Sequence, residues 1–204
     1  MAERVDVVEA LRQRLVEVCR RAYQLGLVPG MSGNISVRLH GEPERVLIKA
    51  TGASMGDMTA EDTVLVDMEG QVLEERPARP SKELFFHLAI YRCRPEVGAV
   101  VHLHPPFATA FAAAGELPPL RTGAARAFLG GERLVLVPPA PSGSRELAER
   151  VEQAFRNPAT QAALLAEHGT ITVGPDLLHA FYLSQYLEDA CRTAMLVRLW
   201  ERCR

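Results

Sequence analysis

The feature that most constrains the fold is a short apolar run, residues 98–106 (Gly-Ala-Val-Val-His-Leu-His-Pro-Pro), which carries two histidines and ends in two prolines. In an extended strand, residues two apart point to the same face, so His102 and His104 present their imidazoles side by side. Leu103, between them, then faces a core. Because proline lacks the N–H that a sheet ladder needs, Pro105 makes His104 the last position of the strand. The two histidines therefore lie at a strand end, beside the loops that usually build sites.

Two interpretations fit this pair of histidines. One is a buried strand with two incidental histidines, which is the better interpretation for a single histidine. Two imidazoles on one face instead favour a metal site, because neutral imidazole is a common metal ligand. His168 precedes Gly169 at a tight turn and would supply a third nitrogen, which is what a catalytic zinc site needs. Taken alone, His168 is typical of a structural turn residue. His40, in a turn, and His179, on a helix, show no comparable partners.

The remaining pattern alternates between helix-like and strand-like segments. Apolar residues at steps of three and four predict a helix over 5–26, and another runs from Pro175 to about Trp200. Ser81 is predicted to cap a helix to about residue 92, and Ser142 a helix to about residue 155. A further helix is predicted over 106–114, and the stretch 121–129 gives no clear prediction. Strands are predicted over 35–39, 45–49, 64–66, 71–73, 134–137, 162–166 and 170–173.

Hairpins dominate this pattern and helices flank them. It predicts an α/β fold of the α+β type, one domain over residues 1–204, with a mostly antiparallel central sheet covered by helices on both faces. A net charge of -2 gives no reason to expect a nucleic-acid or membrane partner. Four widely spaced cysteines predict free thiols, and the chain start shows no signal-peptide pattern, so a cytoplasmic protein is expected. Among 23 basic residues, only Lys49 and Lys82 are lysines, which leaves two candidates for Schiff-base chemistry.

A carboxylate, Glu83, lies on the first turn of the helix that Ser81 is predicted to cap, four residues before His87. An isolated glutamate there is typical of a side chain stabilised by the helix dipole. His87, one turn further, is interpreted as a packing or orienting residue rather than a ligand.

Five segments occur in the order and approximate spacing of the class II aldolase family. They are 30–36 (Gly-Met-Ser-Gly-Asn-Ile-Ser), 50–52 (Ala-Thr-Gly), 79–83 (Arg-Pro-Ser-Lys-Glu), 101–104 (Val-His-Leu-His) and 167–169 (Glu-His-Gly). The chain resembles that family over nearly its whole length, and most of all its bacterial L-fuculose-1-phosphate aldolases. The resemblance implies that His102, His104 and His168 hold Zn²⁺. It also implies that Glu83 is the catalytic acid/base and a fourth metal ligand when no substrate is bound.

The resemblance also implies a substrate. It suggests reversible cleavage of a ketose 1-phosphate, such as L-fuculose 1-phosphate, to dihydroxyacetone phosphate and a small aldehyde such as L-lactaldehyde, by a homotetramer. It implies that the substrate phosphate is bound by Gly33, Asn34, Thr51, Gly52, Ser81 and Lys82. Glycine-rich turns, hydroxyl groups and a helix N-terminus are the devices that hold phosphate well, and all are present here.

Two residues depart from the family pattern. Lys82 stands where the family has a serine, and it either adds a positive charge to the phosphate pocket or is a solvated lysine. Thr122 or a neighbour stands where the family's aldolases have a tyrosine proton donor. A methylthioribulose-1-phosphate dehydratase and a pentulose-phosphate 4-epimerase on the same scaffold remain alternatives, as do a non-catalytic zinc-binding assembly subunit and a Schiff-base aldolase using Lys82.

Overall fold

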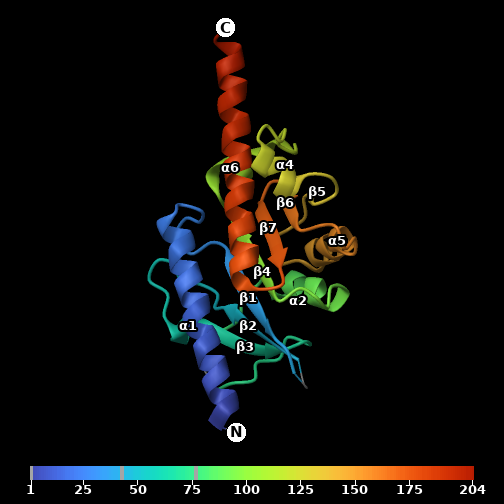
Figure 1. Ribbon diagram of the computed structural model, residues 1–204. Coiled ribbons are helices and arrows are strands. Elements are labelled where there is room, and N and C mark those ends of the chain that lie inside the picture. Colours follow the sequence, from blue (N-terminus) through green and yellow to red (C-terminus); the bar gives the residue numbers. More distant parts are fainter. Residues whose placement is uncertain (1, 42–43, 76–77) are drawn as a thin grey trace.

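The structure is a computed structural model that describes residues 2–41, 44–75 and 78–204 (Figure 1). The helices are α1 (Ala2–Gln24), α2 (Leu84–Cys93), α3 (Pro106–Ala114), α4 (Gly123–Leu129), α5 (Arg145–Phe155) and α6 (Leu177–Arg202), with a 3₁₀ turn η1 (Ala60–Asp62). The strands are β1 (Asn34–Leu39), β2 (Arg45–Lys49), β3 (Thr63–Asp67), β4 (Ala99–Leu103), β5 (Leu134–Val137), β6 (Ala162–Leu165) and β7 (Gly169–Gly174).

All of these strands join one sheet in the order β3-β2-β1-β4-β7-β6-β5. Every neighbouring pair is antiparallel except β5 and β6, which are parallel. The predicted fold class, a mostly antiparallel sheet flanked by helices, is therefore confirmed. Antiparallel pairing brings the end of β2, the start of β1, the end of β4 and the start of β7 to the same edge. We call this edge the site edge.

Helices cover both faces of the sheet, because successive residues of each strand point to opposite sides. On one face, Ile48 and Val100 pack against α2 and α5. On the other, Leu47 and Leu103 pack against α1 and the start of α6, as predicted for Leu103. The rest of α6 packs with α3 and α4 over the β6 end of the sheet, and its last turns extend beyond the sheet (Figure 1). None of the described helices combines the length and apolar character needed to cross a bilayer.

Several predicted boundaries are wrong in informative ways. Helix α2 begins two residues late, at Leu84, because Ser81 first forms a turn in which its carbonyl accepts the Leu84 N–H at 3.0 Å. Helix α5 is capped by Ser144, whose hydroxyl accepts the Leu147 N–H, so the predicted cap Ser142 lies outside it. Strand β4 ends at Leu103, so His104 lies one residue beyond it.

Two further segments also differ from the prediction. Residues 71–73 were predicted to form a strand, but they make only the single bridge between Val66 and Val72. The unassigned stretch 121–129 forms α4, whose first turn is held by Thr122, because the Thr122 hydroxyl accepts the Ala125 N–H at 3.1 Å.

A half-buried carboxylate on α6, Glu188, fixes the helix that follows the histidine strand. Its two oxygens accept the N–H groups of Phe107 at 3.1 Å and Ala108 at 2.8 Å. The N-cap position of α3 is Pro105, whose side chain cannot accept these hydrogen bonds. The pKa of the Glu188 carboxyl is raised overall, because the effect of burial is larger than the opposing effect of the two backbone hydrogen bonds. Glu188 thereby anchors the segment immediately after His104.

Replacing Glu188 by Ala is expected to lower the free energy of unfolding by about 1–3 kcal/mol, because two partly buried N–H groups lose their acceptor. Glu188→Gln keeps one acceptor oxygen and should cost less than the alanine variant. Urea denaturation of both variants measures the difference. Equal losses for Ala and Gln would show that the side-chain volume of Glu188, and not its acceptors, stabilises α3.

Candidate metal centre and phosphate pocket

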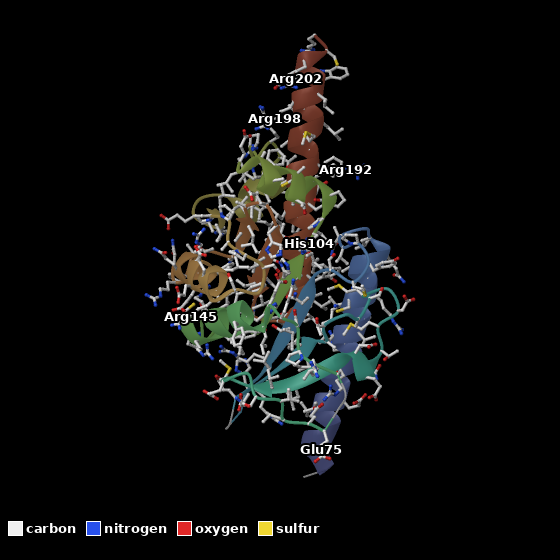
Figure 2. All side chains as sticks on the ribbon, turned by 180° about the vertical axis from the view of Figure 1, so that it is seen from behind. Glu75, His104, Arg145, Arg192, Arg198 and Arg202 are labelled. Atoms are coloured by element: carbon white, nitrogen blue, oxygen red, sulfur yellow. The ribbon has the colours of Figure 1, made fainter. Side chains whose placement is uncertain are left out.

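Three imidazoles from two distant segments converge at the site edge. His102 is the fourth residue of β4, His104 follows that strand, and His168 lies in the turn between β6 and β7. One ligand nitrogen from each lies within 4.8 Å of the other two, and the Nε2 atoms of His102 and His104 are 3.0 Å apart. His104 lies near the middle of the molecule (Figure 2). Pairing of β4 with β7 creates this arrangement, since Leu103 lies opposite Thr170 in the register.

The chemistry of these nitrogens fits a divalent cation. The Nδ1–H of His102 donates to the Thr170 carbonyl at 2.8 Å, which leaves the lone pair on Nε2, the atom that faces the other imidazoles. This hydrogen bond is the usual way in which a metal-binding histidine is oriented. Burial, followed by the charges of His102 and His168, lowers the pKa of His104 to about 3, so this imidazole is neutral. Neutral imidazoles that share one centre are the ligands that zinc prefers.

The Glu83 carboxylate is 5% exposed and lies within reach of the same centre. Its oxygens are 3.2 Å from the Nε2 of His102 and 3.1 Å from the Nε2 of His168. Burial alone would raise the pKa of Glu83, but the neighbouring His102 and His168 side chains and the Ser142 hydroxyl outweigh it and hold the pKa well below its usual range. Because the carboxylate serves this cluster, it makes no cap hydrogen bond at the start of α2.

A chain of hydrogen bonds through His87 and Asn34 orients Glu83. His87 is fully buried, and burial is the largest of the effects that lower its pKa to about 3, so its ring carries one proton. That proton lies on Nε2, which donates a hydrogen bond to the Asn34 side-chain oxygen, and the Asn34 side-chain NH₂ donates to Glu83 Oε2 at 2.8 Å. On the other side, the Ser36 hydroxyl donates to His87 Nδ1 at 2.7 Å and accepts from the Tyr91 hydroxyl at 2.8 Å. His87 thus orients Glu83 through Asn34, in agreement with its interpretation as an orienting residue.

The sequence did not reveal Ser142 as part of this cluster. The chain leaving β5 at the site edge brings the Ser142 hydroxyl to 2.6 Å from Glu83 Oε1, where it donates a hydrogen bond. Thr170 and the role of Ser36 were also missed, because Thr170 acts through its backbone carbonyl and Ser36, although it ends the 30–36 segment, was given no contact there. Thr122 was predicted to stand near the position of the family's tyrosine, but its hydroxyl caps α4.

A cavity of about 260 Å³ opens beside the three imidazoles. Its walls include Glu83, His104 and His168. All six residues predicted to bind phosphate also line it: Gly33, Asn34, Thr51, Gly52, Ser81 and Lys82. The side-chain amide of Asn34 is occupied by His87 and Glu83, so a role for Asn34 in phosphate binding stays a prediction. The cavity therefore joins the metal centre to glycine turns and hydroxyl groups within one space.

Two turns of this site need unusual backbone geometry. Gly33 has a φ of +69°, and a Cβ on it would lie 2.9 Å from the His102 carbonyl, so only glycine fits against β4. Glu167, just before His168, has a φ of +60°, a conformation that costs a non-glycine residue energy and is common near functional sites. Its N–H donates to the Ala112 carbonyl at 3.1 Å, which holds the turn that presents His168.

A larger cavity, of about 570 Å³, lies beside α1 and the start of α6. His40 and His179 line it, but within the described residues they belong to no cluster of three or more metal-ligating side chains. The chemistry-bearing groups therefore gather at the smaller cavity.

Comparisons with known proteins place the chain among sugar-phosphate enzymes of one family. The sequence model described as "Class II Aldolase and Adducin N-terminal domain" matches residues 13–195. The chain is 35% identical over 188 residues to a 3-oxo-tetronate 4-phosphate decarboxylase of Haemophilus influenzae, covering 90% of this chain and 86% of the relative. It is 36% identical over 178 residues to an L-fuculose phosphate aldolase of the same species, covering 87% and 79%. The crystal structure of L-fuculose-1-phosphate aldolase from Thermus thermophilus superimposes with a TM-score of 0.82 at 29% identity, covering 95% and 97% of the two chains.

Proposed function

The chain belongs to the class II aldolase and adducin family, and on this premise we propose that it is a zinc-dependent aldolase acting on a ketose 1-phosphate of the L-fuculose 1-phosphate type. The products would be dihydroxyacetone phosphate and a small aldehyde such as L-lactaldehyde. One observation carries the proposal: three imidazoles and the Glu83 carboxylate share one centre beside a polar cavity.

Different residues of the chain would serve metal binding, phosphate binding and proton transfer. His102, His104 and His168 would hold the zinc ion, with Glu83 as a further ligand when no substrate is bound. The ion would act as a Lewis acid that offsets the negative charge developing on the substrate when the C–C bond breaks. Gly33, Asn34, Thr51, Gly52, Ser81 and Lys82 would bind the phosphate and fix the carbonyl end of the substrate toward the imidazoles.

Glu83 would move the proton at the carbon next to the carbonyl. When the C–C bond breaks, this carbon keeps the electron pair and takes up one proton to complete dihydroxyacetone phosphate. Hydrogen bonds from Asn34 and Ser142 hold the carboxylate in place for that transfer. A general acid or base must lie close to the carbon whose proton it moves, and the position of Glu83 on the cavity wall supports this role.

Product analysis of the zinc-loaded protein tests the proposal. Incubation with L-fuculose 1-phosphate should give dihydroxyacetone phosphate and L-lactaldehyde in equal amounts. ³¹P and ¹H NMR measure the two products. The same assay is run with 3-oxo-tetronate 4-phosphate, methylthioribulose 1-phosphate and a pentulose 5-phosphate. Water loss or inversion without a carbonyl product would identify a dehydratase or epimerase. Bound zinc without turnover of any of these compounds would identify a non-catalytic subunit.

A second candidate is decarboxylation of a 3-oxo sugar-acid phosphate. None of the four tyrosines lines the cavity formed by the described residues, whereas aldol cleavage needs a group to take the proton from the leaving carbon's hydroxyl. Loss of CO₂ needs no such group, because the departing carboxylate is already ionised. Lys82, on the cavity wall, supplies a cation for that carboxylate. Both reactions leave the electron pair on the same carbon and yield dihydroxyacetone phosphate, so release of CO₂ from 3-oxo-tetronate 4-phosphate distinguishes them.

A further inference from the structure

A buried lysine, Lys49, lines the site cavity and has no assigned role. It is the last residue of β2, so it reaches the site edge, where it is paired in register with Thr63. The residue is 2% exposed, yet it forms part of the wall shared with Gly33, Thr51 and Ser81. The side chain is therefore shielded from bulk water, while the residue forms part of the cavity wall.

The charge of Lys49 is not neutralised within the described part of the chain. Nζ donates to the carbonyls of Ala50 at 3.2 Å and Met31 at 3.4 Å, and these use two of its three N–H groups. No carboxylate of a described residue lies within ion-pair distance of it; Cys19 and Asp62 raise its pKa through charge, without a hydrogen bond to Nζ. Burial lowers the pKa of Lys49, as expected for an ammonium held away from water. A buried cation with only carbonyl partners carries an uncompensated desolvation cost.

The distribution of lysine in the chain points to the same cavity. Of the 23 lysine and arginine residues, only Lys49 and Lys82 are lysines, and both line this one space. Arginine presents a broad planar fork, whereas lysine is a compact point charge that fits among closely packed groups. A compact cation is what a small phosphate pocket with little free volume can accommodate.

We propose that Lys49 supplies the positive charge that pairs with the phosphate group of the substrate. The free N–H of Nζ donates to a phosphate oxygen, and the hydroxyls and glycine-turn N–H groups of the cavity donate to the remaining phosphate oxygens. The inference rests on the proposed function only in that the substrate carries a phosphate. The competing explanation is structural: Lys49 would simply tie the carbonyls of Met31 and Ala50 together.

Binding of inorganic phosphate separates the two explanations. Lys49→Met keeps the length and burial of the side chain and removes its charge. Because a hydrogen-bonded, buried charge pair is lost, the Kd for inorganic phosphate, measured by calorimetry, is expected to rise about 10- to 100-fold. Lys82→Met removes an exposed charge from the same cavity and is expected to raise the Kd by at most about five-fold.

Arg202→Gln is the matched control, because it removes one exposed positive charge at the projecting end of α6, far from His104 (Figure 2). It should bind phosphate as the unaltered protein does. A Kd for Lys49→Met within two-fold of the Arg202→Gln value would overturn the proposal, since a purely structural lysine predicts that outcome.

NMR of the unaltered protein gives a test that does not depend on how a variant folds. Protein labelled with ¹³C-lysine has only two lysine ε-CH₂ signals, and Lys82→Arg assigns them. The Lys49 signal is expected to shift during a phosphate titration with the Kd found by calorimetry, and a Lys49 signal that stays fixed at saturating phosphate would overturn the proposal. Neither measurement uses turnover, so a negative result leaves the proposed C–C cleavage, which product analysis tests, unaffected.

Discussion

Replacing Glu83 by Gln is expected to lower kcat for C–C cleavage by about 10²- to 10⁴-fold, the usual contribution of a positioned acid or base. Glutamine keeps the shape of the side chain and can keep the hydrogen bonds to Asn34 and Ser142, but it cannot carry a proton to carbon. The most direct measurement is exchange of the dihydroxyacetone phosphate methylene proton with D₂O, followed by ¹H NMR. This exchange isolates the step assigned to Glu83 from release of the aldehyde.

The control variant changes a second glutamate, one that is adjacent in the sequence to a proposed metal ligand. Glu167 precedes His168 directly, is exposed and does not line the cavity, so Glu167→Gln is expected to change the exchange rate by less than two-fold. Zinc content is measured for both variants, because Glu83 is also expected to contact the ion. Undiminished exchange in a folded, zinc-loaded Glu83→Gln protein would remove Glu83 from the mechanism.

The histidine cluster was predictable because a strand repeats every two residues. That period alone places His102 and His104 on one face, and the prolines that follow fix them near the strand end. His168 could be offered as a third ligand by residue type, but only the resemblance to a family implied that it meets the other two, since nothing local tells which strand its turn will meet. The parallel pairing of β5 with β6 was equally invisible, because it is a contact between segments that have no hairpin signal.

The residues that were missed show which features of the site local sequence patterns do not predict. Ser142 and Ser144 lie two apart before the same helix, and both are good N-cap types, so only the path of the chain decides that Ser144 caps α5 and Ser142 contacts Glu83. Lys49 ends a strand, where a lysine is normally solvated, and its burial follows from the packing of the 31–34 loop and the 50–52 turn around it. Burial that arises from tertiary packing in this way cannot be predicted from the local sequence.

Removal of the metal ligands is expected to have an equally large effect. His104→Ala should abolish stoichiometric zinc and lower kcat/KM by about 10³-fold or more, because a Lewis acid contributes several kcal/mol to the reaction. His104 is the better choice than His102, since His102 is fully buried and bonded to the Thr170 carbonyl, so its loss would also disturb β4 and β7. Treatment of the unaltered protein with a chelator should give the same loss, and added zinc should restore activity.

Thermal unfolding provides a readout of this site that is independent of catalysis. A ligand that binds only the folded state stabilises it, so zinc should raise the Tm of the unaltered protein and leave that of His104→Ala unchanged. His179→Ala is the control, because His179 is exposed and lines the other cavity, and this variant should respond to zinc as the unaltered protein does. If zinc stabilises His104→Ala and the unaltered protein equally, the ion binds elsewhere. Full activity after complete removal of divalent ions would exclude the three imidazoles as a catalytic metal centre.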